Sequence, residues 1–284
     1  GAGDVNENAK RLRQFLNEVI NSPEYRDNKT EEIVLVGPSM GGLITRIALK
    51  EMEFANEEHF VKSWISFDSP HKGASIPIAA QHAIKFGTNF KPPIWDQGSP
   101  NAFIPALEKI NTTAAKQLLL HHYSNTGDKA NPSPEHTAIQ NKLNELGFPI
   151  ISKNYSITNG GKNTLYSERK QILDVKGAPW AYLYGWGNVN SNDNNVIFEG
   201  SRWGANNDQK LKINNEMAIE RGQGGWISAL YSFNYDKKNK NRKNELKEED
   251  VHLQKSNFIP SSSAFGVEVD KNNVFLDHTF RQIL

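Results

Sequence analysis

Apolar residues in the first seventy positions alternate between helical spacing and short continuous runs. From Asn6 to Ile20 they recur in steps of three or one, which predicts an amphipathic helix. The run from Ile33 to Val36 is fully apolar and favours a central strand buried on both faces. A helix from about Gly41 to Phe54 and a strand from Trp64 to Phe67 follow. The order helix, strand, helix, strand predicts a parallel sheet with right-handed crossovers.

The pattern changes after residue 72. Residues 73–148 combine Pro-rich turns with two helical patches, from Ala114 to His121 and from Glu135 to Leu146. Strand character returns from Phe148 and continues to Ile157. We therefore expect a helical insertion between two strands of the sheet.

The last third of the chain is less regular. Residues 177–226 are rich in Gly, Asn and Trp and show no clear period, and residues 236–250 form a charge run typical of a solvated loop. Phe265 to Val269 has the pattern of a late strand. We divide the chain into a core segment at 1–72, an insertion at 73–148 and a C-terminal part of the core at 149–284.

Composition excludes several classes of partner and chemistry. The 284 residues carry 33 Lys and Arg against 32 Asp and Glu, so a net charge of +1 indicates neither nucleic acid nor an anionic membrane as a partner. No apolar run is long enough for a transmembrane helix. The first residues have neither the charged nor the apolar region of a signal peptide, so we expect either a cytosolic protein or one whose leader has been removed. The absence of Cys excludes disulfides, thiolate metal sites and a cysteine nucleophile.

One motif carries candidate chemistry. The segment from Gly37 to Gly41 reads G-x-S-x-G and lies between an apolar strand and an amphipathic helix, the context of a nucleophile elbow. Ser39 is the candidate nucleophile, and the turn needs small residues on both sides of it. The backbone N–H of Met40, at the start of the helix, is a candidate oxyanion donor. The alternative is a plain Gly-rich turn, although it lacks the Lys of a phosphate-binding loop.

The candidate acid is Asp68. It ends the strand after the elbow strand, and neighbouring parallel strands end at the same edge of a sheet, so Asp68 and Ser39 should lie close together. Asp174 and Asp250 are alternatives, and Asp68 could instead cap the turn that follows it.

The candidate bases are among eight histidines. We interpret His71, in a Pro-His-x-Gly turn, as structural rather than catalytic. The pair His121 and His122 is more consistent with a helix end than with a metal site, because no third ligand follows at a familiar spacing.

Three segments resemble α/β-hydrolase-fold lipases and esterases, and they occur in the same order. Val36–Leu43 resembles the elbow of those enzymes, Ser66–Ala74 resembles their (T/S)PH-x-G(S/A) segment, and Phe258–Ala264 resembles the VPxxSAL segment before the last strand. The chain is also similar to Asn-rich, secreted hydrolase-like proteins of Bacteroidetes type, including the stretch Lys116–Tyr123. The resemblance implies an α/β fold with a mainly parallel, α/β-hydrolase-type sheet and a helical cap at 73–148.

The resemblance also implies an activity and a base. His278 lies 15 residues after Ser263, a spacing similar to that of bacterial lipases, which makes it the candidate base; His252 is a weaker one, and the base could also follow Leu284. Ser39, Asp68 and His278 would then cleave a small-molecule or lipid ester through an acyl-enzyme, with no metal or cofactor. A secreted or cell-surface location follows from the same resemblance.

The chain departs from the resembled pattern in one respect. Ser39 comes early, because the fold normally places three or four strands before its elbow, and the loop that donates the second oxyanion N–H is missing. We therefore expect the chain to be a fragment whose sheet is completed by a preceding chain segment. The departure also motivates a different class, a non-catalytic binding or structural protein on a degenerate hydrolase scaffold. An acyltransferase or amidase with the same triad is a third possibility.

Overall fold

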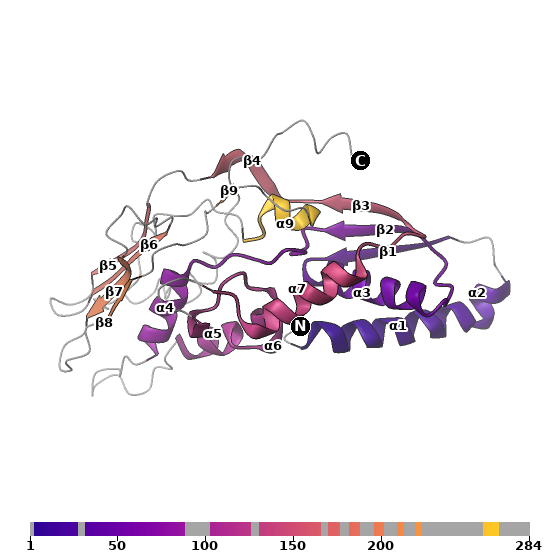
Figure 1. Cartoon of the computed structure of the whole chain (residues 1–284), viewed down its shortest axis with the longest axis horizontal. Helices are drawn as coiled ribbons and strands as arrows, with labels where there is room; N and C mark the ends of the chain where they lie inside the picture. Colours follow the sequence, from indigo (N-terminus) through magenta and orange to yellow (C-terminus); the bar gives the residue numbers. More distant parts are fainter. Residues whose placement is uncertain are drawn as a thin grey trace, which may run out of the picture.

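The computed structural model combines a parallel sheet, helices against one of its faces, a helical insertion and a set of antiparallel strands (Figure 1). The fold is therefore α/β, as the hydrophobic pattern predicts. The structure describes residues 3–27, 32–88, 103–125, 131–165, 170–176, 182–187, 196–201, 209–212, 220–222 and 258–266.

The parallel sheet has the strand order β1-β2-β3, with β1 at Ile33–Pro38, β2 at Val61–Phe67 and β3 at Lys153–Ile157. Both pairings are parallel, and they align Val36, Ile65 and Tyr155 in one row across the three strands. The predicted parallel sheet is thus confirmed. Because the strands are parallel, their carboxyl ends lie at the same edge of the sheet. Ser39 follows β1 and Asp68 follows β2 at that edge.

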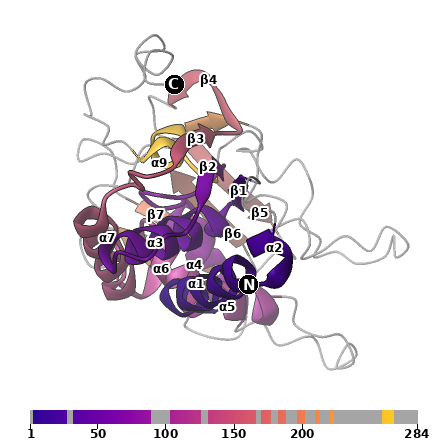
Figure 2. The ribbon, with the colours of Figure 1, turned by 90° about the vertical axis from the view of Figure 1, so that its right-hand side faces the viewer.

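Three helices cover one face of this sheet: α1 at Val5–Asn21, α3 at Met40–Phe54 and α7 at Pro134–Leu146 (Figures 1 and 2). A short helix, α2 at Pro23–Asp27, follows α1. The apolar stripes of the three long helices meet in one buried cluster, as their sequence periodicity predicts. Its buried members are Val5, Ala9, Leu43, Ile47, Ala48, Ile139 and Leu143.

The opposite face of the sheet is apolar and open to solvent in the described part of the chain. Val34 and Val36 are 56 % and 52 % exposed, and no described helix covers them. The prediction that Ile33 to Val36 forms a central strand buried on both faces is therefore wrong for the described residues, where β1 is an edge strand paired with β2 alone. Further exposed apolar residues on the three strands are Phe67, Tyr155 and Ile157.

The insertion between β2 and β3 is helical. It holds more helices than the sequence predicts, and the patch expected to continue to His121 ends at Leu118. The helix stops there because Leu118 O and Leu120 N hydrogen-bond to the backbone of Ala74 at 2.7 and 2.9 Å. Besides α7, the insertion contains α4 at Ile78–Gly87, α5 at Phe103–Ile110, α6 at Thr113–Leu118 and a 3-10 helix, η2, at Tyr123–Asn125.

Antiparallel strands follow β3, in a region where the sequence shows no clear period. Their shortness and the Gly and Asn residues between them hide the alternation that identifies a strand. Phe265, predicted to begin a strand, instead ends a short helix, α9 at Ser261–Phe265. The strands are β4 (Gly160–Leu165) paired with β9 (Glu220–Gly222), and a sheet of β5 (Lys170–Lys176), β6 (Tyr182–Gly187), β7 (Val196–Ser201) and β8 (Gln209–Lys212).

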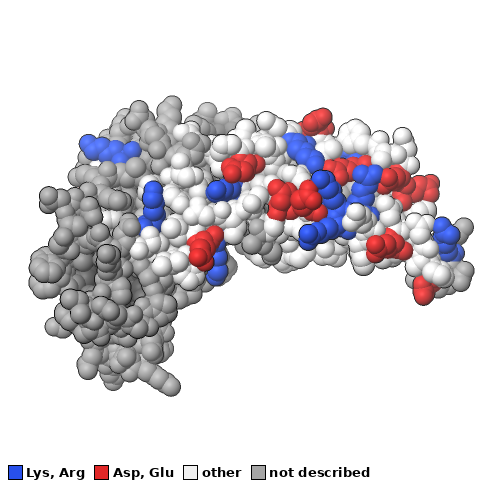
Figure 3. All heavy atoms as spheres, turned by 90° about the horizontal axis from the view of Figure 1, so that it is seen from below, with Lys and Arg blue, Asp and Glu red and all other residues white. Residues whose placement is uncertain are grey.

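Charges of both signs are interspersed on the face that α1 presents (Figure 3). Lys10 pairs with Glu7, and Arg13 of α1 pairs with Glu57 beyond the end of α3. This face carries no large basic area among the described residues, in keeping with the nearly balanced composition. None of the described helices combines the length and the apolar character that crossing a membrane requires.

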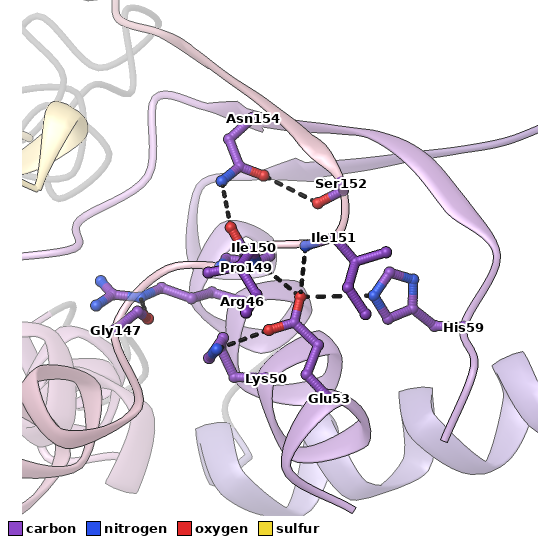
Figure 4. Close-up of polar contacts among 10 residues, drawn as sticks. All are labelled: Arg46, Lys50, Glu53, His59, Gly147, Pro149, Ile150, Ile151, Ser152 and Asn154. Atoms are coloured by element: carbon purple, nitrogen blue, oxygen red, sulfur yellow. Dashed lines mark hydrogen bonds and ion pairs between the residues drawn. The ribbon is translucent and has the colours of Figure 1, made fainter. Parts of the chain in front are cut away.

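A buried charged cluster fastens the end of α3 to the start of β3 (Figure 4). The side chains of Lys50 and Glu53 are only 7 % and 4 % exposed, and their charged groups lie 2.6 Å apart. The Glu53 carboxylate also accepts hydrogen bonds from the N–H groups of Ile150 and Ile151, at 2.8 and 3.1 Å. Those N–H groups are thus engaged before the sheet begins, so β3 starts at Lys153 rather than at Phe148.

The electrostatics of Glu53 follow from these partners. Burial alone would raise its pKa, but the hydrogen bonds from Lys50 and from the two backbone N–H groups lower it overall. His59 Nε2 lies 3.7 Å from the same carboxylate, and burial lowers the pKa of His59. On the other side of α3, Arg46 donates to the carbonyls of Leu143 and Gly147 at the end of α7. The second half of α3 therefore joins the sheet and α7.

We expect Glu53→Gln to lower the free energy of unfolding by about 3 kcal/mol, because it leaves the Lys50 ammonium buried without a counter-charge. Urea denaturation at pH 7, followed by tryptophan fluorescence, measures this. The matched control is Glu57→Gln, which removes a half-exposed ion pair with Arg13 and should cost about 0–1 kcal/mol. Equal losses of unfolding free energy in the two variants would show that the buried pair stabilises the fold no more than the more exposed pair does.

Candidate active site

Ser39 lies at the sharp turn between β1 and α3. Its backbone has φ 50° and ψ −126°, a conformation that non-glycine residues rarely adopt and that usually persists only where the surroundings impose it. The residue is exposed at the carboxyl edge of the sheet. The strand, turn and helix expected around the G-x-S-x-G motif are therefore present.

The glycines of the motif leave no space for side chains. A Cβ at Gly37 would lie 2.6 Å from both Gly41 O and Thr45 Oγ1, and a Cβ at Gly42 would lie 2.0 Å from Ser69 Oγ. At Gly41 the nearest atom, Pro38 Cδ, would be 3.2 Å away, which is tight rather than prohibitive. Gly37 and Gly42 thus permit the turn.

The first turn of α3 can stabilise negative charge beside Ser39. Met40 is the first residue of this 15-residue helix. N–H groups in the first turn of a helix have no partner within the helix, and the helix dipole is positive there. Met40 begins α3 as expected, and the role of its N–H as an oxyanion donor stays a prediction.

Asp68 directly follows β2, as Ser39 directly follows β1. Ser39 N donates to Phe67 O at 2.8 Å, and Asp68 N donates to Ile157 O at 2.6 Å, so each residue continues the ladder by one step. Asp68 also has a positive φ, of 46°. The structure thus brings the predicted nucleophile and the predicted acid to neighbouring positions at the carboxyl edge.

The Asp68 carboxylate is held by a residue that the sequence analysis does not single out. Asn159 donates to one carboxylate oxygen through its backbone N–H and to the other through Nδ2, both at 3.1 Å, and the hydroxyl of Thr158 lies 3.4 Å away. These partners follow β3, rather than belonging to the turn after Asp68. The available signal was the position of Thr158 and Asn159 at the end of the third predicted strand.

The other predicted acids and bases are not brought together with Ser39 in the described residues. His278, His252 and Asp250 lie outside those residues. Asp174 lies in β5, part of the separate antiparallel sheet. The structure therefore neither supports nor opposes His278 as the base.

His71 lies in the turn after β2 and is almost completely buried. Its Nε2 is 2.7 Å from Ser66 Oγ, and its ring meets the rings of Trp64 and Phe148 edge-on. Burial, and then the charge of Arg46, lower the pKa of His71 to about 3, so the ring is neutral at ordinary pH. The described contacts of the ring do not include Ser39, which agrees with a structural role.

The histidines of the insertion have backbone and side-chain partners. His122 is within hydrogen-bond distance of Ile110 O through Nε2 and of Ser124 Oγ through Nδ1, and His136 lies 2.9 Å from Gln117 O. In the part of the chain that the structure describes, no three His, Cys, Asp or Glu side chains are grouped so as to hold a metal ion.

The strained serine between a parallel strand and a helix, on a sheet of this topology, supports an α/β-hydrolase-like scaffold. Residues 3–111 match the family model described as the PGAP1-like alpha/beta domain. The match includes α1, β1, the elbow, β2 and the first helices of the insertion. Searches of curated proteins and of solved structures gave no match.

We expect the free energy of unfolding to fall as the pH drops from 6.5 toward 4. Burial lowers the pKa of His71 to about 3 and of His82 and His121 to about 4, whereas each titrates near 6.5 in the unfolded chain. Stability from each is complete above pH 6.5 and is lost as the pH falls, because only the unfolded chain then takes up the proton. Urea denaturation from pH 7.5 to 5 measures the slope.

The matched variant is His71→Gln, which keeps a hydrogen-bonding group against Ser66 but cannot titrate. Its slope should be shallower than that of the wild type by about 1.4 kcal/mol per pH unit. Identical slopes in the two proteins would contradict a neutral, buried His71.

Proposed function

We propose that the protein is a serine hydrolase that cleaves carboxylic esters through an acyl-enzyme on Ser39. The observation that carries the proposal is the backbone of Ser39, held at φ 50° at the start of α3 with glycines packed around it. A serine held in this way presents its hydroxyl at the N-terminus of a helix, where the positive end of the helix dipole favours the negative charge that develops during attack on a carbonyl. The match to the PGAP1-like alpha/beta domain supports a hydrolase-type scaffold.

The proposed residues have separate roles. The Oγ of Ser39 forms a bond to the ester carbonyl carbon while His278 takes its proton, and the Met40 N–H donates to the oxyanion. When the carbon–oxygen bond of the ester breaks, His278 returns the proton to the leaving alcohol. Water then cleaves the acyl-enzyme by the same route. Asp68 orients His278 and stabilises its charged form.

Two features of Asp68 favour it as the acid. It follows the strand next to that of Ser39, and Asn159 and Thr158 hold its carboxylate at a fixed position. A carboxylate with a fixed position can hold the histidine in one tautomer and orientation. The substrate class is a small-molecule or lipid ester, and the resemblance to secreted hydrolases leads us to propose a secreted or cell-surface location.

A second candidate function is binding without catalysis, on a scaffold that has lost its activity. The open apolar face of the sheet favours it, because it indicates that the described elements do not form a closed α/β unit.

Labelling with a fluorophosphonate probe tests the proposed hydrolase in the natural full-length protein. We expect covalent labelling and hydrolysis of a short-chain p-nitrophenyl ester, with Ser39→Ala removing the labelling and lowering kcat at least about 10⁴-fold. Asp68→Asn should lower kcat by about 10⁴-fold with little change in KM, because the histidine loses its orienting charge. Ser22→Ala, at the end of α1, is the control.

The outcomes separate the alternatives. A wild type that neither labels nor hydrolyses the ester contradicts the hydrolase and favours the binding protein. Normal activity in Asp68→Asn would assign the role of the acid to Asp174 or Asp250. Normal activity in His278→Gln would assign the role of the base to another histidine.

We further propose that a segment of the same polypeptide on the N-terminal side of α1 completes the sheet at β1 and covers the bare face on which Val34 and Val36 lie. Two features of the described residues support this: β1 pairs with β2 alone, and Val34 and Val36 are more than half exposed on the bare face. Unpaired strand edges and open apolar faces of parallel sheets are unstable in isolation.

The direction of α1 identifies where the preceding strand would lie. α1 runs opposite to the strands (Figure 1), and its N-terminus is tied to the insertion, where Val5 N donates to Gln117 and Gln117 donates to Asp4. A strand leading into α1 would therefore end at the carboxyl edge, parallel to β1. Since α1 and α3 lie on one face, right-handed crossovers place that strand on the side of β1 away from β2.

Cysteine labelling tests this proposed neighbour, since the 284 residues contain no Cys. In the natural full-length protein, Val36→Cys should react with a maleimide at least about tenfold more slowly than Lys10→Cys, whose lysine side chain is 62 % exposed. Both should react fast in urea, with peptide mass spectrometry identifying the labelled site. Equal rates in the native protein would contradict the proposal, and protection lost on dilution would indicate a second copy instead.

A further inference from the structure

Two buried hydroxyl groups contact the backbone on either side of Ser39. The hydroxyl of Thr45 donates to Gly41 O at 2.8 Å and also lies 3.0 Å from Gly42 O. The hydroxyl of Ser69 lies 3.1 Å from Gly37 O and 3.3 Å from Phe67 O. The carbonyl groups of the first and last glycines of the G-x-S-x-G motif are thus each contacted by a buried hydroxyl.

Trp64 fixes the direction of the Thr45 hydroxyl. Its indole N–H, buried on the inner face of β2, lies 2.7 Å from Thr45 Oγ1. Because an indole nitrogen can only donate, Thr45 accepts this bond, and its own hydrogen then points to the carbonyls of α3. The bond thus links β2 to the turn.

The same hydroxyls fill the space that the glycines leave. Thr45 Oγ1 lies where it would meet a Cβ at Gly37, and Ser69 Oγ lies where it would meet a Cβ at Gly42. Thr45 and Ser69 are 4 % and 0 % exposed, so water cannot replace either hydroxyl without repacking. Without the Thr45 hydroxyl, the buried indole N–H of Trp64 would lose its acceptor and be left unsatisfied.

We infer that Thr45 and Ser69 are positioning residues, which hold the backbone on both sides of Ser39 so that its hydroxyl and the Met40 N–H keep the geometry needed for acyl transfer. The inference rests on the proposed hydrolase function. The unfavourable backbone of Ser39 persists only while its surroundings impose it, and these two hydroxyls hold the carbonyls that flank it. Trp64 acts through Thr45.

The experiment compares fluorophosphonate labelling rates and ester kinetics in the natural full-length protein. Thr45→Val keeps the shape of the side chain but removes the hydroxyl, and Thr45→Ser keeps the hydroxyl. Ser69→Ala removes the second hydroxyl. Ser133→Ala is the matched control, since Ser133 is also a buried hydroxyl with a stabilising role, at the N-cap of α7, but does not contact the elbow.

We expect Thr45→Val and Ser69→Ala to lower the labelling rate and kcat by about 10- to 100-fold with little change in KM, the effect of a small misplacement of reacting atoms. Thr45→Ser should stay within about threefold of the wild type. Ser133→Ala should lower Tm as much as Thr45→Val does but leave labelling unchanged. A normal labelling rate in Thr45→Val, a slow rate in Thr45→Ser, or an equal slowing in Ser133→Ala would overturn the inference.

A second measurement separates this inference from the proposed function. If the wild type does not label, the hydrolase proposal fails. Amide hydrogen exchange then tests by itself whether the Thr45 hydroxyl holds the turn. Ser39 N and Gly42 N donate to Phe67 O and Ser39 O, so they report on the turn. Faster exchange at both amides in Thr45→Val than in Ser133→Ala supports a positioning role for Thr45, and equal exchange refutes it.

Discussion

The first turn of α3 lies so close to the loop after β2 that no side chain fits between them. Gly42 approaches Ser69 at a distance that even a methyl group would block, and Gly37 approaches Thr45 in the same way. This close approach seats α3 against the sheet at its N-terminal end, while Glu53 fastens its other end to the turn before β3. With both ends fixed, the helix has little freedom to tilt, and the strained backbone of Ser39 is a consequence of that constraint.

Much of the core could be predicted from the sequence, because its signals are local. The apolar run of β1, the glycines after it and the periodicity of α1 and α3 each lie within a few residues of the feature they specify. The nucleophile candidate and its strand–turn–helix setting follow from the same signals. The neighbouring position of Asp68 follows from parallel topology, since successive strands end at one edge.

The remaining features depend on contacts between distant residues, which a single sequence does not reveal. The start of β3 is set by a carboxylate almost a hundred residues earlier, and the end of α6 is set by a bridge to Ala74. The partner of Asp68, Asn159, follows a different strand. The bare face of β1 was not predicted. A continuous apolar run is consistent with a strand covered on both faces, and equally with a strand that the described elements cover on one face only.

The turn after Asp68 is completed by a residue that lies 190 positions after Gly73 in the sequence. Ser263, in α9, accepts a hydrogen bond from Lys72 N at 3.0 Å and donates one to Gly73 O at 2.6 Å. During synthesis, the sheet, the elbow and the insertion are all made long before residue 263 leaves the ribosome. The nascent chain therefore carries an unfinished turn beside its candidate active site until residue 263 has been made. The order of synthesis thus delays the appearance of a finished site.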